Sequence, residues 1–151
     1  MIPVFADTSY YVALFQADDV GHEEALRFSR EEARQTLLTD FVLLELANAF
    51  SRGGARRFFV DLVGSLKTNP NVTIVAASRG LFDAGLRLYA QRMDKDWSLT
   101  DCISFVVMRQ HRLTEALTAD HHFEQAGFKV LLKQQSRRAK RNCGTNPISE
   151  S

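Results

Sequence analysis

Short apolar runs alternate along the chain with longer segments in which apolar residues recur at helical spacing. The apolar runs predict strands at residues 4–6, 36–39, 72–75, 115–118 and 128–132. The periodic segments predict helices at residues 8–17, 22–33, 40–52, 55–67, 78–93, 98–111 and 120–125. Because strands alternate with helices, we expect an α/β protein with a three-layer α/β/α fold around a mainly parallel sheet.

Polar residues mark the ends of some of these elements. Asp40 stands directly before an apolar helical segment, so we expect its side chain to cap that helix. The segment from Gln134 to Ser151 has little apolar content and is expected to form a flexible or weakly helical tail. The sequence therefore predicts one domain at residues 1–133, followed by a basic and polar tail at residues 134–151.

Composition narrows the class of protein. The 151 residues are 45% hydrophobic and 25% charged, which is ordinary for one soluble globular domain. No apolar run approaches the ~20 residues that a membrane-spanning helix needs, and the N-terminus lacks the pattern of a secretory signal. The two cysteines, Cys102 and Cys143, do not suggest a disulfide framework. We therefore expect a cytoplasmic protein without a membrane association.

The net charge of +1 conceals an uneven distribution. From Lys133 onward the chain has five basic residues and one acid, Glu150. The preceding 132 residues have 14 basic and 17 acidic residues, so their net charge is −3. Proteins that bind nucleic acid usually carry positive charge somewhere, and the basic segment at residues 137–141 could bind nucleic-acid phosphates or could be a solvated extension without a role.

Two acids follow predicted strands. Asp7 comes directly after the first strand, and Asp120 lies two residues after the strand that ends at Thr118. In an open α/β sheet, ligands bind beyond the carboxyl ends of the strands, so both carboxylates stand where a site is expected. Either residue could instead cap the helix that follows it.

Two further acids lie on predicted helices. Asp101 closes the segment Ser98-Leu99-Thr100-Asp101, which matches a capping box and therefore has a structural explanation of its own. Glu45 lies among apolar residues inside a helix and has no cap to make. It either reaches the edge of a buried face, where an unpaired charge would be costly, or shares a narrow solvent-facing stripe with Asn48 or Arg52.

As a set, Asp7, Glu45, Asp101 and Asp120 predict a divalent-metal site. Carboxylates that are brought together repel one another, which raises some of their pKa values unless a cation neutralises them. Oxygen ligands without a cysteine cluster favour Mg²⁺ or Mn²⁺ over Zn²⁺. Two such ions, about 3.5–4 Å apart, could activate water and stabilise the leaving oxygen of a phosphodiester.

The order of these acids and the residues around them resemble the PIN-domain nucleases, and among them the VapC-type toxins of bacterial toxin–antitoxin pairs. The resemblance covers about residues 2–132. It is carried by four segments, which are Asp7-Thr8-Ser9 with Val12-Ala13-Leu14, Thr39 with Glu45 and Asn48, Ser98 to Phe105, and Ala116 to Phe128.

The resemblance implies a role for each matched residue. The four acids would line a Mg²⁺ or Mn²⁺ site at which an endoribonuclease hydrolyses RNA to 5′-phosphate and 3′-hydroxyl ends. Thr8 and Ser9 resemble the polar residues that support the first Asp, and Thr118 could support Asp120. The resemblance also implies a homodimer and a cognate antitoxin that covers the acidic groove.

Other assignments explain less of the sequence. A phosphoacceptor signalling domain would need an acidic pair after the first strand and a lysine late in the chain near the site, whereas Thr8 follows Asp7. A haloacid-dehalogenase-like phosphatase would need an acid at Ser9. A PIN domain that acts in RNA processing or structure-specific cleavage, or one that only binds, stays open as an alternative to a toxin.

The pair His121-His122 invites a metal-ligand interpretation. Adjacent helix residues are expected to point in different directions, so we do not expect both rings to face one ion. For His122 we expect packing or a hydrogen bond instead.

Overall fold

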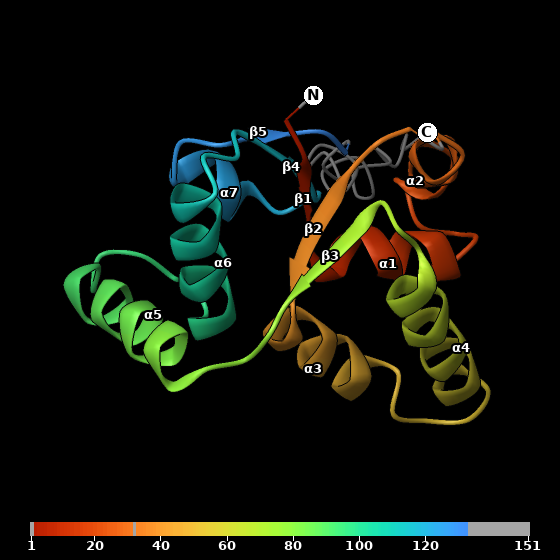
Figure 1. Ribbon diagram of the computed structural model, residues 1–151, viewed down its shortest axis with the longest axis horizontal. Coiled ribbons are helices and arrows are strands. Elements are labelled where there is room, and N and C mark those ends of the chain that lie inside the picture. Colours follow the sequence, from red (N-terminus) through yellow and green to blue (C-terminus); the bar gives the residue numbers. More distant parts are fainter. Residues whose placement is uncertain (1, 32, 133–151) are drawn as a thin grey trace, which may run out of the picture.

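A five-stranded sheet lies at the centre of the computed structural model, which describes residues 2–31 and 33–132 (Figure 1). Its strands are β1 (Val4–Ala6), β2 (Thr36–Thr39), β3 (Val72–Val75), β4 (Glu115–Leu117) and β5 (Lys129–Val130). They lie in the order β3-β2-β1-β4-β5, and every pairing of neighbours is parallel. All five carboxyl ends therefore lie at the same edge of the sheet, and the predicted parallel α/β architecture is confirmed.

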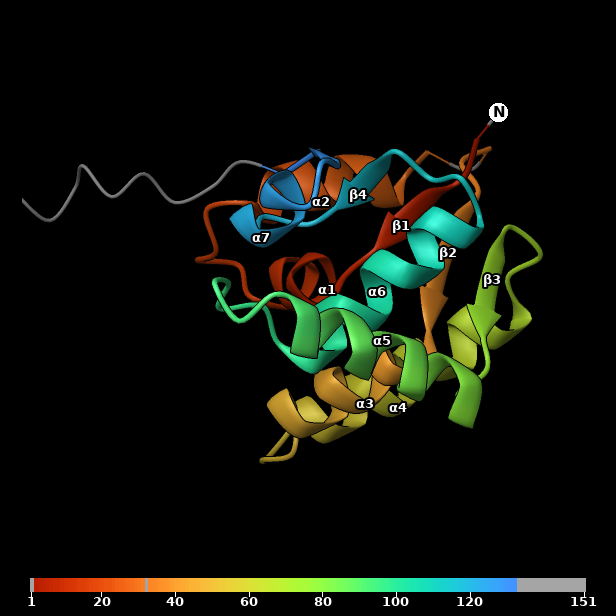
Figure 2. The same ribbon diagram turned by 90° about the vertical axis from the view of Figure 1, so that its left-hand side faces the viewer.

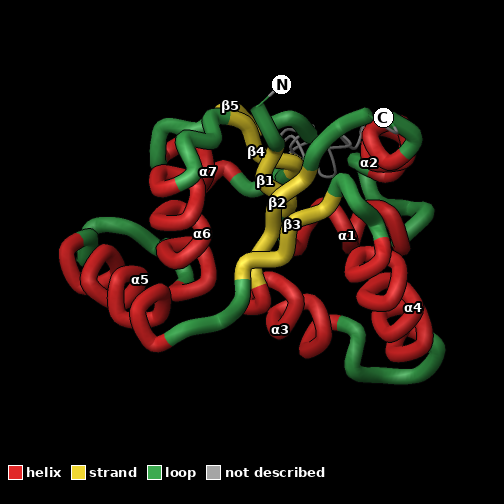
Figure 3. Tube along the Cα trace, viewed as in Figure 1, coloured by secondary structure: helices red, strands yellow, loops and turns green. Residues whose placement is uncertain are grey.

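Helices lie on both sides of this sheet (Figures 1 and 3). On one side are α1 (Thr8–Phe15), α2 (His22–Ser29) and α4 (Ala55–Thr68). On the other are α5 (Arg79–Gln91), α6 (Leu99–Gln110) and α7 (His121–Gln125). Helix α3 (Asp40–Ala49) continues directly from β2 and lies below the strands in Figure 1. The two groups of helices and the sheet between them form the expected three layers.

The side chains of β1 alternate between two apolar cores, as the geometry of a strand requires. Val4 and Ala6 belong to the core that the sheet shares with α1, α2 and α4. Phe5 belongs to the opposite core, where its ring lies 6.2 Å from that of Phe123 in α7. Phe123 in turn makes an edge contact with Phe105 of α6 at 4.9 Å. These aromatic contacts fix α6 and α7 against β1, the strand that Asp7 follows.

Helix α6 is also fixed from its outer side by α5. Gly85 of α5 is buried against Ile103 of α6, and a Cβ atom at Gly85 would overlap Ile103 Cγ1. The absence of a side chain is therefore what allows the two helices to approach so closely. Since Asp101 lies two residues before Ile103, this contact helps to set the position of its carboxylate.

Several element boundaries and one helix cap differ from the sequence predictions. Helix α2 ends at Ser29, short of the expected residue 33, and β5 comprises only Lys129–Val130. The cap of α3 is Thr39, whose Oγ1 accepts a hydrogen bond from the Val42 N–H at 3.1 Å. The prediction that Asp40 caps this helix was wrong. Asp40 is already the first helical residue, whereas a capping residue typically has extended backbone, as Thr39 does.

The carboxylate of Asp40 has a different partner, the backbone N–H of Ala77, at 2.8 Å. It therefore ties the start of α3 to the loop that follows β3. The predicted tail at residues 134–151 lies outside the described residues. No helix of the described chain is both long and apolar enough to cross a membrane.

Candidate metal centre

The four candidate carboxylates come from segments that converge at the carboxyl edge of the sheet. Asp7 follows β1 and Asp120 follows β4, and these strands are hydrogen-bonded neighbours with Ala6 opposite Leu117. In Figure 2 the carboxyl ends of both strands point toward α1 and α7, and α6 crosses in front of β1. Asp101 lies in the first turn of α6, and Glu45 lies within α3.

Asp7 is buried and is held by a chain of hydroxyl groups. Thr118 Oγ1 donates to Asp7 Oδ2 at 2.9 Å, so Ser9 Oγ, also 2.9 Å from Thr118 Oγ1, must donate to Thr118. The backbone N–H groups of Ala119 and Asp120 donate to Ser9 Oγ and Thr118 Oγ1 at 3.1 and 3.0 Å. Every hydrogen in this chain points toward the Asp7 carboxylate, which the arrangement therefore favours as an anion.

The capping explanation for Asp7 is wrong. Asp7 occupies the N-cap position of α1, but its side chain makes no capping hydrogen bond. Its partner lies instead 111 residues away in the sequence, on Thr118. The carboxylate is thus directed across the sheet edge and not toward its own helix.

Burial, together with the smaller effects of the charges of Asp101 and Glu45, raises the pKa of Asp7 from 3.8 to about 7. The hydroxyl of Thr118 and the backbone N–H of Thr8 act in the opposite direction, but burial outweighs them. A carboxylate in such surroundings is costly to ionise without a nearby cation. A cation bound beside Asp7 would shift this pKa in the opposite direction.

Asp101 combines a structural role with a place in the cluster. Its backbone N–H donates to Ser98 Oγ at 3.0 Å, and its Oδ2 accepts from the Ser98 N–H at 3.1 Å, so the predicted capping box is confirmed. The same Oδ2 lies 3.2 Å from Nδ1 of His122. Burial, and then the charge of Asp120, raise the pKa of Asp101. The cap therefore fixes one oxygen without removing the residue from the cluster.

Asp120 caps α7, as its second interpretation predicted, because its Oδ1 accepts from the His122 N–H at 2.9 Å. Glu45 is half-buried, and its Oε1 accepts a hydrogen bond from Thr8 Oγ1 at 2.7 Å. This contact directs Glu45 toward α1 and Asp7 and not along a solvent-facing stripe with Asn48. Thr8 thus contacts one acid of the cluster and neighbours another.

The two histidines of α7 belong to the same region. Their rings lie 4.4 Å apart, and together with Asp120 they present possible ligand atoms that all lie within 4.8 Å of one another. The expectation that adjacent residues would point apart is therefore wrong, because both rings turn toward Asp120. The expected hydrogen-bonding role of His122 is confirmed by its contact with Asp101. The sequence signal that could have indicated the approach of His122 to the acids is its position two residues after Asp120, at the start of a helix.

The residues of the cluster fit a divalent cation. In the part of the chain that the structure describes, no lysine or arginine pairs with any of the four carboxylates, and the basic side chains that approach them are the imidazoles of His121 and His122. Buried carboxylates without a basic partner need another source of positive charge. Carboxylate oxygens are the ligands that Mg²⁺ and Mn²⁺ prefer, so the donor set suits either ion.

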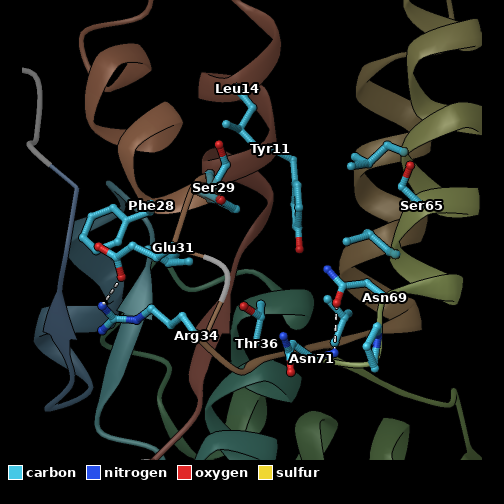
Figure 4. Close-up of a pocket in the computed structure, with 16 residues that line it drawn as sticks. Tyr11, Leu14, Phe28, Ser29, Glu31, Arg34, Thr36, Ser65, Asn69 and Asn71 are labelled. Carbon is cyan, nitrogen blue, oxygen red and sulfur yellow. Dashed lines mark hydrogen bonds and ion pairs between the residues drawn. The ribbon is translucent and has the colours of Figure 1, made fainter.

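A separate hollow of about 500 Å³ lies between α1, α2 and α4 (Figure 4). Tyr11 and Phe28 project into it, and at its rim Arg34 pairs with Glu31 at 3.0 Å. None of the four carboxylates lines this hollow. The acidic cluster and the hollow are therefore different places on the molecule.

Comparisons with known proteins agree with this geometry. A PIN domain model matches residues 4–129. The 23S rRNA-specific endonuclease VapC20 of Mycobacterium tuberculosis is 26% identical over 125 residues, which cover 83% of this chain and 95% of the relative. The resemblance to VapC-type proteins that the motifs indicate is thus confirmed.

Solved structures show the same fold. The crystal structure of Mycobacterium tuberculosis VapC20, a Sarcin-Ricin loop cleaving toxin, matches with a TM-score of 0.76 at 24% identity, over 85% of this chain and 98% of that one. A DNA-bound VapBC complex from Salmonella typhimurium matches with a TM-score of 0.58 at 13% identity, over 86% and 97%. FitAcB from Neisseria gonorrhoeae matches with a TM-score of 0.59 at 17% identity, over 85% and 96%. Because the family model spans most of the sequence, this protein belongs to the PIN domain family.

Proposed function

We propose that this protein is a metal-dependent endoribonuclease of the VapC type. The observation that carries the proposal is the convergence of Asp7, Glu45, Asp101 and Asp120, with two of these carboxylates buried and without a lysine or arginine partner in the described chain. Membership of the PIN domain family and the endonuclease activity named for VapC20 support it.

In this proposal, Asp7 and Asp101 hold Mg²⁺ or Mn²⁺, and Glu45 and Asp120 complete the acidic surround. When bound, the ion would supply a water of lowered pKa and would stabilise negative charge on the phosphodiester. The expected products are a 5′-phosphate and a 3′-hydroxyl.

The other residues of the site keep the carboxylates in place. Thr118, supported by Ser9, donates to Asp7 and so keeps that carboxylate oriented toward the cluster. Thr8 does the same for Glu45. Such outer contacts typically change metal affinity or activity by about 10–100-fold when they are removed.

The relatives suggest the substrate and the partner. Since VapC20 is named for 23S rRNA and for the Sarcin-Ricin loop, we propose a structured loop of ribosomal RNA as the first substrate class to test. The match to a VapBC complex supports a cognate antitoxin as the binding partner. A homodimer and a cytoplasmic location are part of the same proposal, and the nuclease domain is assigned to residues 1–133.

The test is cleavage of an RNA oligonucleotide that contains the Sarcin-Ricin loop, by purified protein with Mg²⁺ or Mn²⁺. EDTA should abolish cleavage, and Asp7→Asn or Asp101→Asn should each reduce kcat by at least ~10²–10³-fold, the range typical for removal of one electrostatic group from an active site. Asp61→Asn is the matched control, because this acid is exposed on α4 and, among the described residues, its ion pair is with Arg57. Cleavage that survives EDTA, or full activity in Asp7→Asn, would overturn the proposal.

A further inference from the structure

His122 lies between two carboxylates that come from different parts of the chain. Its Nδ1 is 3.2 Å from Asp101 Oδ2 and 3.3 Å from Asp120 Oδ1, and its side chain is only 19% exposed. Asp101 belongs to the first turn of α6, whereas Asp120 precedes α7. One ring nitrogen therefore connects the two helical segments of the acidic cluster.

The neighbours of this nitrogen indicate which of the two ring nitrogens carries a hydrogen. Both atoms within reach of Nδ1 are carboxylate oxygens, which accept hydrogen bonds when ionised. Nδ1 must therefore carry the hydrogen, because an unprotonated nitrogen would face two acceptors. A nitrogen that carries a hydrogen has no free lone pair for a metal ion.

The hydrogen bonds at Asp101 and Asp120 gather on one oxygen of each carboxylate. Oδ2 of Asp101 accepts from the Ser98 N–H and faces His122 Nδ1. Oδ1 of Asp120 accepts from the His122 N–H and faces the same Nδ1. Within the described chain, these contacts leave Oδ1 of Asp101 and Oδ2 of Asp120 without a hydrogen-bond donor.

We propose that His122 is a positioning residue that holds Asp101 and Asp120 through Nδ1–H, so that the second oxygen of each carboxylate stays available to a divalent ion. This inference rests on the proposed metal-dependent function. With a hydrogen on Nδ1, that nitrogen is not available to the ion, and the proposal assigns His122 no role as a ligand. A shared donor between two like charges also reduces their mutual repulsion, which would otherwise drive the half-exposed Asp120 away from Asp101.

His121 provides a matched control on the same helix. Its Nδ1 lies 3.7 Å from Asp120 Oδ1, its side chain is 52% exposed, and it makes no contact with Asp101 in the described structure. It resembles His122 in residue type and position but does not connect the two carboxylates. A change at His121 therefore tests the effect of losing an imidazole near the cluster without losing the connection.

The test measures Mn²⁺ binding to the full chain by isothermal titration calorimetry in the absence of RNA. His122→Ala should weaken the affinity by about 10–100-fold. His122→Asn should stay within about threefold of the unchanged protein, since the Asn amide N–H lies near the place of Nδ1–H. His122→Gln, whose amide extends toward the place of Nε2, should resemble His122→Ala, and His121→Ala should bind Mn²⁺ more tightly than His122→Ala. Circular dichroism of each variant checks that α7 and the fold are kept.

Equal Mn²⁺ affinity in His122→Ala and the unchanged protein would overturn the inference. So would nitrogen coupling to bound Mn²⁺ in an electron spin-echo spectrum that disappears in His122→Ala, because that result would make His122 a ligand. A loss of affinity in His122→Asn equal to that in His122→Ala would also contradict a role for Nδ1–H. Since no RNA is present, a protein that binds Mn²⁺ in this manner but cleaves no RNA would refute the proposed nuclease and leave the positioning role intact.

Discussion

Asp7 and Asp120 belong to the same acidic cluster, but their surroundings differ. Asp7 is 4% exposed and receives its hydrogen bond from a hydroxyl chain on β4 and α1. Asp120 has a side chain that is 28% exposed, caps α7, and faces His122. At Asp7, which we call the strand side of the cluster, burial has the largest effect on the carboxylate. At Asp120, which we call the helix side, a backbone N–H group, an imidazole and solvent compensate the charge.

The two sides therefore need a cation to different degrees. The pKa of Asp7 rises to about 7, so near neutral pH the ionised and protonated forms of this carboxyl group have similar free energies. A divalent ion would remove the cost of ionising Asp7 on the strand side first. Near Asp120 the same ion would add less, because other groups already compensate the charge of that carboxylate.

The largest expected effect is on stability as a function of pH in the absence of metal. The folded-state pKa of Asp7 exceeds the unfolded value of 3.8, so between pH 3.8 and 7 the folded protein keeps a proton that the unfolded chain releases. The free energy of unfolding should therefore fall as pH rises through this window, by up to about 4 kcal/mol from this group. Urea unfolding from pH 4 to 8 measures it.

Asp7→Asn is the control for that experiment. The Asn carbonyl can still accept the hydrogen bond from Thr118, but the residue cannot ionise. The variant should lose most of the pH dependence and should be more stable than the unchanged protein at pH 8 without metal. An equally steep fall in the variant would show that burial of Asp7 is not the cause, and the contrast between the two sides would be lost.

The next prediction concerns only the hydroxyl group that donates to Asp7. Thr118→Val keeps the shape of the side chain but leaves the buried Asp7 carboxylate without its hydroxyl donor. We expect metal affinity and kcat to fall by about 10–100-fold. Thr118→Ser restores the hydroxyl and should recover most of the loss. Normal Mn²⁺ binding by Thr118→Val, measured by titration calorimetry, would mean that the hydroxyl chain does not support the site.

The smallest effect is expected on the helix side. Asp120→Asn removes the charge but keeps a good capping residue, so the melting temperature should change little. Activity should fall by about tenfold, the lower end of what supporting contacts contribute, and by less than in Asp7→Asn. A larger loss in Asp120→Asn than in Asp7→Asn would reverse the comparison. Kinetics at saturating Mn²⁺ decides between the two outcomes.

The sequence predicted the elements well where the pattern is local. The apolar runs and helical spacings located every strand and helix of the described residues, and errors were confined to boundaries such as the end of α2 at Ser29. The prediction that Asp40 caps α3 was wrong for a related reason, because the cap is the neighbouring Thr39. Both residues are good caps, and only the backbone angles at the start of α3 distinguish them.

By itself, the sequence determined the α/β class, the family resemblance and the four acids that stand near strand ends or helix starts, because hydrophobic periodicity and residue order are properties of the chain. The tertiary structure decided what each acid contacts. The register of β1 against β4 brings Asp7 to Thr118, and the packing of α6 beside α7 brings Asp101 to His122. These partners are 111 and 21 residues apart, and no local pattern encodes a contact at such separation. Burial, which raises the pKa of Asp7, likewise appears only when the layers assemble.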